Sequence, residues 1–434
     1  TVFEEYERAY ANLVDANRPQ VTFVSGGAGT GKSVFVKWLS TKLPEDSFIV
    51  LCPTGVSAIN VRGQTIHSFC CFPPAVIDFS ELLQRSHYSS PDKIKKIVKQ
   101  IKYVIFDEIS MVRCDLFDAV DQFFRHFSGN RNSGLIFGGK KILLVGDLMQ
   151  LPPVAQKEDK IAVKRLGYSE PFYCFNSKVW DEMITELIAL TQNRRQDSVE
   201  FYGHLNNIRL GRNIQNAISF LNSSCPGSDT CFPVLTMTRE NARAINEREM
   251  DCLPFSDHLF RGEIIGDFPE DCMPAPLVVR LKVGSRVMML KNDPNSGFVN
   301  GTVGEILEIK RGQTLISEYV KIRLSDSGET VFVFHAVWER YQHRYCAKEN
   351  NYSLQIVGRY VQIPVIPAWA MTVHKSQGLT ISELVVDRED RGAFVPGQIY
   401  VALSRCSKIK GLFLRRELRH NDVICSQSAI GAYE

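Results

Sequence analysis

The chain has 434 residues, which is too long for a single hydrophobic core and predicts two to four domains. With 44% hydrophobic and 23% charged residues, the composition is that of a soluble globular protein. The composition shows neither a disordered nor a coiled-coil bias, and no apolar run approaches the length of a membrane span. The formal net charge of +3 argues neither for nor against nucleic-acid binding, because acidic faces elsewhere readily offset a basic groove.

The twelve cysteines are scattered along the chain and form no CxxC pair. Cys70 and Cys71 are adjacent and therefore cannot form a normal disulfide with each other. Scattered cysteines in a large chain are typical of reduced thiols, so we expect an intracellular compartment. This would be the cytoplasm of a bacterium, or the nucleus or mitochondrion of a eukaryote. The spacing that a Cys/His metal site needs is absent, so no structural zinc is expected.

The first motif is the glycine-rich run at 26–33, Gly-Gly-Ala-Gly-Thr-Gly-Lys-Ser. It lies between an apolar run at 21–24 and a helical pattern at 34–39, and strand, turn and helix in this order are what a phosphate cradle requires. Lys32 is placed to reach the β- and γ-phosphates, and the Ser33 hydroxyl to bind Mg²⁺. The sequence therefore predicts a bound nucleoside triphosphate. The residues assigned to it are Gly27, Ala28, Gly29, Thr30, Gly31, Lys32 and Ser33.

Short apolar runs alternate with helical patterns in the first half of the chain, which predicts a parallel sheet flanked by helices. Candidate strands lie at 21–24, 48–52, 103–106 and 141–145, and a polar or glycine-rich turn follows each of them. In open α/β sheets, ligands bind at the carboxyl ends of the strands. The chemically suggestive residues are therefore expected to meet at one edge of the sheet.

Two stretches interrupt this pattern. Residues 71–90 contain a proline pair and are predicted to form a small insertion. The lysine-rich run at 93–102 suggests nucleic-acid binding at first sight. Its apolar residues recur at helical spacing, however, which favours an amphipathic helix with a solvated lysine face.

The strand at 103–106 ends in Asp107 and Glu108. In phosphoryl-transfer sites an Asp at this place holds Mg²⁺, and the Glu after it polarises the attacking water. Such a pair alone commonly marks a sheet edge, but downstream of a phosphate loop it predicts nucleotide hydrolysis. Gln150 follows the strand at 141–145, and its amide suits a sensor of both the γ-phosphate and the attacking water. The alternative is an incidental glutamine in a strand-to-loop turn.

A second α/β unit is expected from about residue 185, and the short strands between 303 and 365 predict an inserted all-β module. Within this unit, Arg195 follows an apolar pattern that we assign to a helix, and Arg405 ends the run Tyr-Val-Ala-Leu-Ser-Arg. A guanidinium fork suits the charge on a transferring phosphoryl group. Strands of the second unit are expected at 234–236, 286–290, 384–386 and 411–414, with a helix near 240–248.

The segments at 53–60 and 63–69, Pro-Thr-Gly-Val-Ser-Ala-Ile-Asn and Gly-Gln-Thr-Ile-His-Ser-Phe, closely resemble a hallmark of Pif-type helicases. These are superfamily-one enzymes of the 5′-to-3′ branch. Further motifs resemble those of the family in its own order, and agreement of ordered motifs is far more specific than any one of them. They lie at 107–112, 146–154, 284–306, 370–380 and 400–405.

The resemblance implies an α/β fold of two RecA-like P-loop domains, with ATP in the cleft between them and single-stranded DNA running across both. Domain 1A would comprise residues 1–185, with a small wedge insertion, 1B, at about 71–90. Domain 2A would comprise residues 186–302 and 366–434. The SH3-like accessory domain 2B would comprise residues 303–365.

The resemblance also implies an ATP-dependent helicase that uses Mg²⁺, translocates 5′ to 3′ on single-stranded DNA and unwinds duplex as its two domains open and close. G-quadruplexes and RNA–DNA hybrids are alternative substrates. The implied partners are single-stranded DNA and its junctions with duplex, with no membrane. The implied state is a monomer, with a DNA-induced dimer as the alternative. Roles in DNA repair, recombination and telomere maintenance come with the family name alone.

The residues implied by the resemblance fall into four groups. The catalytic residues are Lys32, Glu108, Gln150, Arg195 and Arg405; Ser33 and Asp107 hold the metal, and Gly378 joins the nucleotide contacts. The DNA contacts are Thr54, Gly55, His67, Thr238, Asn246, Thr372, His374 and Lys375. Hydroxyls, backbone amides and a lysine fit a motor that does not read sequence. For His67, the alternative is a buried, hydrogen-bonded histidine.

The sequence departs from the family pattern at three places. The family usually carries a Gln upstream of the phosphate loop that recognises adenine, and Gln20 is out of register for it, which leaves base selectivity open. Leu148-Met149 replace common aromatic residues. Arg194 also stands where an aromatic residue is common, and we favour Arg195 as the arginine finger.

Two other functions remain open from the sequence. One is a 3′-to-5′ DNA motor or an RNA helicase, which tailed substrates distinguish. The other is a nucleotide-gated nucleic-acid binding module without motor activity, which DNA-stimulated ATP hydrolysis would exclude.

Overall fold

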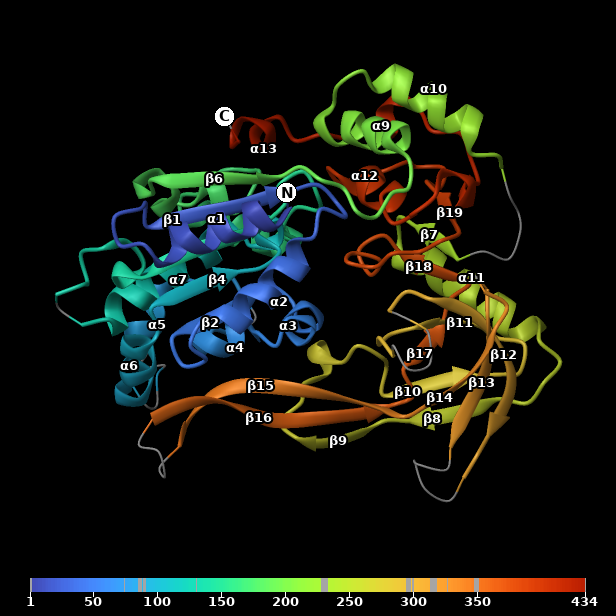
Figure 1. The fold of residues 1–434 in the computed structure, drawn as a ribbon, viewed down its shortest axis with the longest axis horizontal. Helices are drawn as coiled ribbons and strands as arrows, with labels where there is room; N and C mark the ends of the chain where they lie inside the picture. Colours follow the sequence, from blue (N-terminus) through green and yellow to red (C-terminus); the bar gives the residue numbers. More distant parts are fainter. Residues whose placement is uncertain are drawn as a thin grey trace. The chain divides into compact units, whose positions relative to one another are not determined.

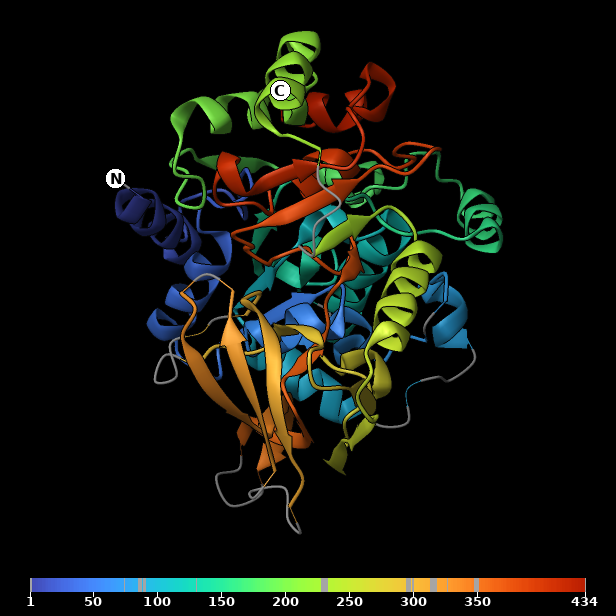
Figure 2. The same ribbon diagram turned by 90° about the vertical axis from the view of Figure 1, so that its right-hand side faces the viewer.

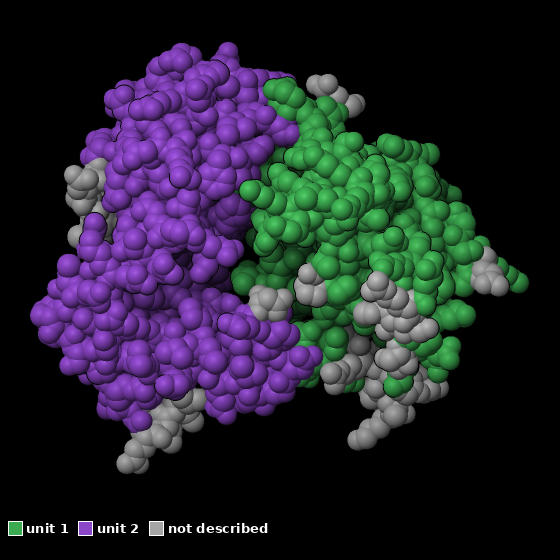
Figure 3. Space-filling view, turned by 180° about the vertical axis from the view of Figure 1, so that it is seen from behind, with its two compact units in different colours: residues 1–192, 339–357, 427–434 green, residues 193–338, 358–426 purple. Residues whose placement is uncertain are grey.

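The computed structural model of the chain consists of two compact units joined by several crossings (Figures 1 and 2). Unit 1 comprises residues 1–192, 339–357 and 427–434, and unit 2 comprises residues 193–338 and 358–426 (Figure 3). No helix in the described part of the chain is long and apolar enough to cross a membrane. The structure describes residues 2–73, 75–84, 88, 91–129, 131–227, 233–293, 298, 300–312, 318–325, 327–346 and 351–433.

A six-stranded sheet forms the centre of unit 1, and the pairings between its neighbouring strands are all parallel. Its order is β3-β2-β4-β5-β1-β6, and the four strands expected from the sequence are confirmed. The strands are β1 (Val21–Gly26), β2 (Phe48–Cys52), β3 (Gln64–Thr65), β4 (Tyr103–Phe106), β5 (Lys141–Gly146) and β6 (Thr185–Leu190).

Helices connect and flank these strands, as a parallel sheet requires. The lysine-rich run forms α6, in which Val98 is buried and the lysines are exposed, so the amphipathic-helix interpretation is confirmed. The α-helices of unit 1 are α1 (Val2–Val14), α2 (Lys32–Lys42), α3 (Gly55–Asn60), α4 (Ile66–Cys70), α5 (Phe79–Gln84), α6 (Pro91–Gln100), α7 (Cys114–Phe127), α8 (Lys157–Arg165) and α13 (Gln427–Gly431). The 3₁₀ turns are η1 (Ile109–Met111), η2 (Ile136–Gly139), η3 (Cys174–Asn176) and η4 (Val179–Glu182).

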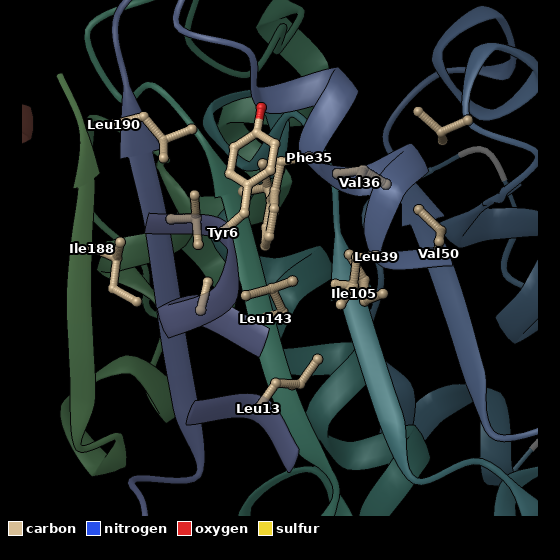
Figure 4. Close-up of a cluster of buried hydrophobic side chains, with 14 of the residues drawn as sticks. Tyr6, Leu13, Phe35, Val36, Leu39, Val50, Ile105, Leu143, Ile188 and Leu190 are labelled. Atoms are coloured by element: carbon tan, nitrogen blue, oxygen red, sulfur yellow. The ribbon is translucent and has the colours of Figure 1, made fainter. Parts of the chain in front are cut away.

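The main core of unit 1 lies between its sheet and the helices α1 and α2 (Figure 4). Tyr6 of α1 packs beside Phe35 of α2, with ring centroids 4.9 Å apart, and its hydroxyl donates a hydrogen bond to the carbonyl of Gly31 at 2.7 Å. Helix α1, which the sequence analysis did not predict, therefore supports the glycine-rich loop directly.

The assignment of a helix just before Arg195 is wrong. Those residues form β6, which pairs with β1 from Val21↔Thr185 to Gly26↔Leu190. Burial along β6 alternates near its end, because Ile188 and Leu190 face the core while the residues between and before them do not. The contacts consequently divide the chain after residue 192, because β6 belongs to the first sheet.

Unit 2 contains a second parallel sheet, β18-β7-β19-β20, which confirms two α/β halves. Its strands are β7 (Val234–Thr236), β18 (Ala370–Thr372), β19 (Leu384–Asp387) and β20 (Leu412–Leu414). Its helices are α9 (Val199–Leu210), α10 (Ile214–Ser224), α11 (Arg239–Cys252) and α12 (Gln398–Leu403), with 3₁₀ turns η5 (Glu270–Cys272), η7 (Ile409–Gly411) and η8 (His420–Asp422).

The expected β module is present as antiparallel strands, drawn gold to orange in Figure 2. A five-stranded sheet has the order β14-β13-β12-β11-β17, with β11 (Arg286–Met289), β12 (Val303–Lys310), β13 (Tyr319–Leu324), β14 (Thr330–Phe334) and β17 (Val365–Pro367). The other strands are β8 (His258–Arg261), β9 (Glu263–Gly266), β10 (Val278–Leu281), β15 (Ala336–Cys346) and β16 (Asn351–Gln362). The length of β15 and β16 was not foreseen, and residues 339–357 are grouped with unit 1.

The proposed wedge near 71–90 lies partly outside the described residues, which omit 74, 85–87 and 89–90. Helix α5 is its described secondary structure, and Phe79 of α5 packs against Phe72 and Phe123. The function of this segment as a wedge stays a prediction.

Candidate functional site

The glycine-rich loop joins β1 to α2 in unit 1, and its conformation requires glycine. Gly29 and Gly31 have φ values of 81° and 96°, in the region that side chains other than glycine rarely adopt. The ammonium group of Lys32 donates hydrogen bonds to the carbonyls of Gly26 at 2.7 Å and Gly27 at 2.9 Å. Lys32 is thus 9% exposed and held across the loop, where it can meet a phosphate.

Asp107 and Glu108 follow β4 as expected. Asp107 is 4% exposed, and its Oδ1 accepts a hydrogen bond from the N–H of Glu108 at 3.0 Å. Burial and the neighbouring Glu108 carboxylate raise the pKa of Asp107 to about 7, although the charges of Lys32 and Lys37 act in the opposite direction. Glu108 has a φ of 53° and is half-buried, an unusual backbone for a glutamate that fits a functional constraint.

Gln150 lies in the loop after β5. It is 4% exposed, and its amide nitrogen donates to Asp147 Oδ2 at 3.3 Å. The same loop is tied down by Tyr433, whose hydroxyl oxygen accepts from the N–H of Leu148 at 2.9 Å and from the Ser25 hydroxyl at 2.8 Å. Tyr433 was not foreseen in the sequence, because only the tertiary structure brings it beside the loop.

The order of the sheet explains why these groups meet. Strand β5 pairs with β1 on one side and with β4 on the other, all in parallel. The loops that carry Lys32, Glu108 and Gln150 therefore leave the same edge of three neighbouring strands. This arrangement is the one that sequence analysis expected for nucleotide hydrolysis.

The donor set at this edge fits Mg²⁺. Asp107 supplies a carboxylate, and the exposed Ser33 at the start of α2 supplies a hydroxyl. Mg²⁺ prefers oxygen ligands and commonly keeps several waters while binding one or two protein oxygens and the phosphates. Bound there, the metal would neutralise charge that develops on the transferring phosphoryl group.

We expect Mg²⁺ binding at this site to weaken as the pH falls from 8 to 6. With a pKa of about 7, Asp107 carries a proton below neutrality that Mg²⁺ must displace, so the apparent affinity should drop about tenfold over this range. The measurement is a Mg²⁺ titration of nucleotide binding at each pH. The Asp107→Asn variant is the control, because its remaining pH dependence belongs to the nucleotide. Equal pH profiles for the two proteins would contradict the prediction.

The DNA contacts expected in unit 1 lie at the ends of β2 and β3. Thr54 is exposed and caps α3, with its hydroxyl bonded to Ser57, while Gly55 is buried at the first position of that helix. His67 is half-buried on α4. The next residue of α4, Ser68, accepts a hydrogen bond from Arg340 of β15 at 2.8 Å, so Arg340 is a cation beside this region that sequence analysis missed.

The DNA contacts expected in unit 2 gather at the ends of β7 and β18, which pair as Thr372↔Thr236. Thr238 caps α11, and Thr372 accepts a hydrogen bond from the N–H of Lys375. Burial and the nearby charge of Arg239 lower the pKa of His374, so this imidazole is neutral at pH 7. Arg239, the exposed first residue of α11, is a second cation that sequence analysis missed.

Asn246 is placed differently from the other expected contacts. Its amide nitrogen donates to the carbonyl of Ala370 at 2.7 Å, and its Oδ1 accepts from the N–H of Ala370 at 2.9 Å. Asn246 therefore ties α11 to β18 through both ends of its amide. Its contact with DNA stays a prediction.

Arg195 and Arg405 meet at Ser404 within unit 2. Arg195 is half-buried and donates to the carbonyl of Ser404 at 3.2 Å. Arg405 is 1% exposed, and it donates to the carbonyl of Val401 at 3.0 Å and to those of Ser376 and Leu379 at 3.5 Å. Arg405 thus holds the loop that contains Gly378, whose φ of 82° marks a glycine-dependent turn.

Gln20 has a structural role in unit 1. Its amide nitrogen donates to the carbonyls of Ile136 and Lys140, both at 2.7 Å, and so joins the start of β1 to the turn before β5. This position agrees with the expectation that Gln20 is out of register for recognising adenine.

Comparison with known proteins decides the family. The family model described as PIF1-like helicase matches residues 2–217, and that of the DNA helicase Pif1 2B domain matches residues 271–309. Unliganded Pif1 from Bacteroides sp. is 30% identical with a TM-score of 0.85, and the alignment covers 99% of this chain and 96% of that one. The chain belongs to the Pif1-like helicase family. The resemblance of its motifs is thereby confirmed, as is the α/β fold with a β module.

Curated Pif1-like relatives of this chain are longer than it is. The ATP-dependent DNA helicase RRM3 of Saccharomyces cerevisiae is 29% identical over 92% of this chain and 63% of its own length. The ATP-dependent DNA helicase PIF1 of Homo sapiens is 29% identical over 91% of this chain and 58% of its own. This chain spans about three-fifths of both. Bacteroides sp. Pif1 has also been solved with ADP-AlF4, at 29% identity and a TM-score of 0.86. That alignment again covers 99% of this chain and 96% of that one.

Proposed function

We propose that this chain is an ATP-dependent DNA helicase that moves 5′ to 3′ along single-stranded DNA and separates duplex. The observation that carries the proposal is the convergence of Lys32, Glu108 and Gln150 at one edge of the unit 1 sheet, in a member of the Pif1-like family. Together these residues form a site that hydrolyses a nucleotide rather than only binding one.

Each residue has a distinct task in this proposal. Lys32 and the loop N–H groups bind the phosphates, and Asp107 with Ser33 orients Mg²⁺. Glu108 orients and polarises the attacking water, and Gln150 reports whether the γ-phosphate is present. Burial and the Glu108 carboxylate raise the pKa of Asp107 to about 7, so the charged form that Mg²⁺ needs prevails above neutral pH.

The two parallel sheets are proposed to act as RecA-like domains 1A and 2A that open and close with the ATP cycle. Domain 1A, expected at residues 1–185, would extend through β6 to about residue 192, with the wedge near 71–90, and the SH3-like module would comprise residues 303–365. Arg195 and Arg405 would make hydrolysis depend on closure. DNA would contact Thr54, Gly55 and His67 in unit 1, and Thr238, Thr372, His374, Lys375 and Asn246 in unit 2.

The proposed partners are single-stranded DNA and its junctions with duplex. The chain is proposed to act as a monomer, with a dimer induced by DNA as the alternative. Pif1 from Bacteroides has been solved bound to single-stranded DNA, at 30% identity and a TM-score of 0.66, over all of this chain and 96% of that one. Several buried cysteines, among them Cys114, Cys174 and Cys406, are free thiols, which fits the proposed reducing compartment.

The test is ATP-dependent unwinding of one duplex that carries either a 5′ or a 3′ single-stranded tail. We expect unwinding from the 5′ tail and none from the 3′ tail. Unwinding from the 3′ tail alone would contradict the polarity and the DNA contacts assigned above. DNA-stimulated ATP hydrolysis without unwinding would contradict the helicase activity and would leave a translocase or a switch.

A further inference from the structure

A carboxylate of the chain itself occupies the start of helix α11 in unit 2. Glu389 Oε1 accepts hydrogen bonds at 3.0 Å from the N–H of Met237, from the N–H of Thr238 and from the Thr238 hydroxyl. Two main-chain N–H groups and a hydroxyl aimed at one anionic oxygen form the kind of cradle that receives a phosphate oxygen. Thr238 is also a residue to which the proposed function assigns a DNA contact.

Glu389 is held in this position from both sides. Its φ of 58° lies in the region that non-glycine residues rarely adopt. Its N–H donates to Asp387 Oδ1 at 2.9 Å, and its carbonyl accepts from Arg388 at 3.3 Å. Arg388 is 4% exposed and pairs with Asp422 at 3.3 Å. These hydrogen bonds and the buried Arg388–Asp422 ion pair therefore fix the backbone that carries this carboxylate.

The start of helix α3 in unit 1 corresponds to the start of α11, but the group bonded there is an uncharged hydroxyl. Thr54 follows β2 and caps α3, as Thr238 follows β7 and caps α11. The Thr54 hydroxyl shares a hydrogen bond of 2.7 Å with the Ser57 hydroxyl. A hydroxyl is displaced by a phosphate without charge repulsion, whereas a carboxylate at the same place opposes an arriving phosphate. The two units thus differ in the charge that DNA meets.

The surroundings of the cradle carry positive charge as well as negative charge. The exposed Arg239 directly follows Thr238, and the dipole of the 14-residue helix α11 is positive at this end, although the exposed Glu240 lies in the same first turn. Glu389 is therefore the carboxylate that lies on the cradle itself and opposes a DNA phosphate there.

We propose that the Glu389 carboxylate competes with the DNA backbone for the cradle at the start of α11. The carboxylate fills the α11 cradle until a DNA phosphate displaces it, and it refills the cradle when the strand leaves. The inference rests on the proposed function, because each domain of such a motor must loosen its hold on the strand once in every cycle. Competition of this kind weakens the grip of unit 2 and acts mainly on the rate of dissociation.

The test is the affinity of the full chain for a fluorescein-labelled oligothymidine, measured by fluorescence anisotropy. Glu389→Gln keeps the side-chain length and an acceptor oxygen but removes the charge, and we expect the Kd to fall about tenfold, mainly through slower dissociation. The matched control is Glu383→Gln, which removes an exposed carboxylate from the same unit and should change the Kd less than about twofold. Adding Thr238→Ala to Glu389→Gln should abolish the gain.

Three outcomes would overturn the inference. An unchanged or weaker affinity in both Glu389→Gln and Glu389→Ala, with normal thermal unfolding, would make Glu389 a support for α11 rather than a competitor. Wild-type affinity in Thr238→Ala would show that the cradle does not bind DNA, while the helicase proposal would stand. Failure of the wild-type chain to bind the oligothymidine at all would overturn the proposed function together with this inference.

Discussion

Replacing Glu108 by Gln is expected to lower DNA-stimulated ATP hydrolysis about 10²–10⁴-fold while ATP still binds. Gln has the same shape but does not accept a proton from the attacking water. Asp107 and Lys32 are unchanged in this variant, so the metal and phosphate contacts remain. The measurements are the steady-state ATPase rate on oligothymidine and the Kd of a fluorescent ATP analogue.

The control is Glu158→Gln on α8, which removes an exposed carboxylate from the same unit and should leave the rate unchanged. A wild-type rate in Glu108→Gln would contradict the assignment of the base. Loss of nucleotide binding would instead show that Glu108 helps to bind ATP before the chemical step. Its φ of 53° makes normal thermal unfolding of the variant a necessary check.

Replacing Arg195 by Ala is expected to lower ATP hydrolysis about 10³–10⁵-fold, the range known for arginine fingers in phosphoryl transfer. The guanidinium is half-buried and donates to the Ser404 carbonyl from one nitrogen, and its planar fork of five N–H donors matches the oxygens of a phosphate. Arg195→Lys should recover little activity, because lysine keeps the charge but loses the planar fork.

The neighbouring Arg194 provides a matched control. It is exposed, and Arg194→Ala removes the same charge one residue away, so its ATPase rate should stay near that of the wild type. A large loss of ATPase activity in Arg194→Ala with little loss in Arg195→Ala would show that Arg194, and not Arg195, is the arginine finger. Arg405→Ala should lower thermal stability as well as activity, because its buried guanidinium holds three main-chain carbonyls.

The strands that carry the nucleotide site could be predicted from the sequence because each is a short apolar run bounded by a turn. The segment at 185–190 ends in a short apolar run, Leu-Ile-Ala-Leu, and we assigned it to a helix because a run of that length fits either structure. Pairing with β1 settles the choice, and pairing is a tertiary property. Helix α1 had a readable signal, since Val2, Tyr6, Ala9 and Leu13 recur at helical spacing and are all buried.

The motifs predicted which residues gather at a site, but not what holds them there. Nothing in the sequence around Asn246 indicates that its amide is bonded to Ala370, 124 residues away. The same is true of Glu389 and Thr238, which are 151 residues apart. Hydrogen bonds between distant segments depend on the folded topology, so sequence patterns alone do not reveal which polar side chains are already engaged.

Because the chain returns to unit 1 at α13, some contacts of unit 1 can form only late in synthesis. The hydrogen bond between Ser25 and Tyr433 joins residues 408 apart, and the one between Leu148 and Tyr433 joins residues 285 apart. At about 5–20 residues per second, a ribosome needs about 20–80 s to travel from the first of these residues to the last. The sheet of unit 1 is complete in sequence long before that. The nascent chain therefore passes through a stage in which Ser25 at the end of β1 and Leu148 in the loop after β5 lack their hydrogen bonds to Tyr433. The loop that carries Gln150 gains this support only after the residues that follow α13 are made.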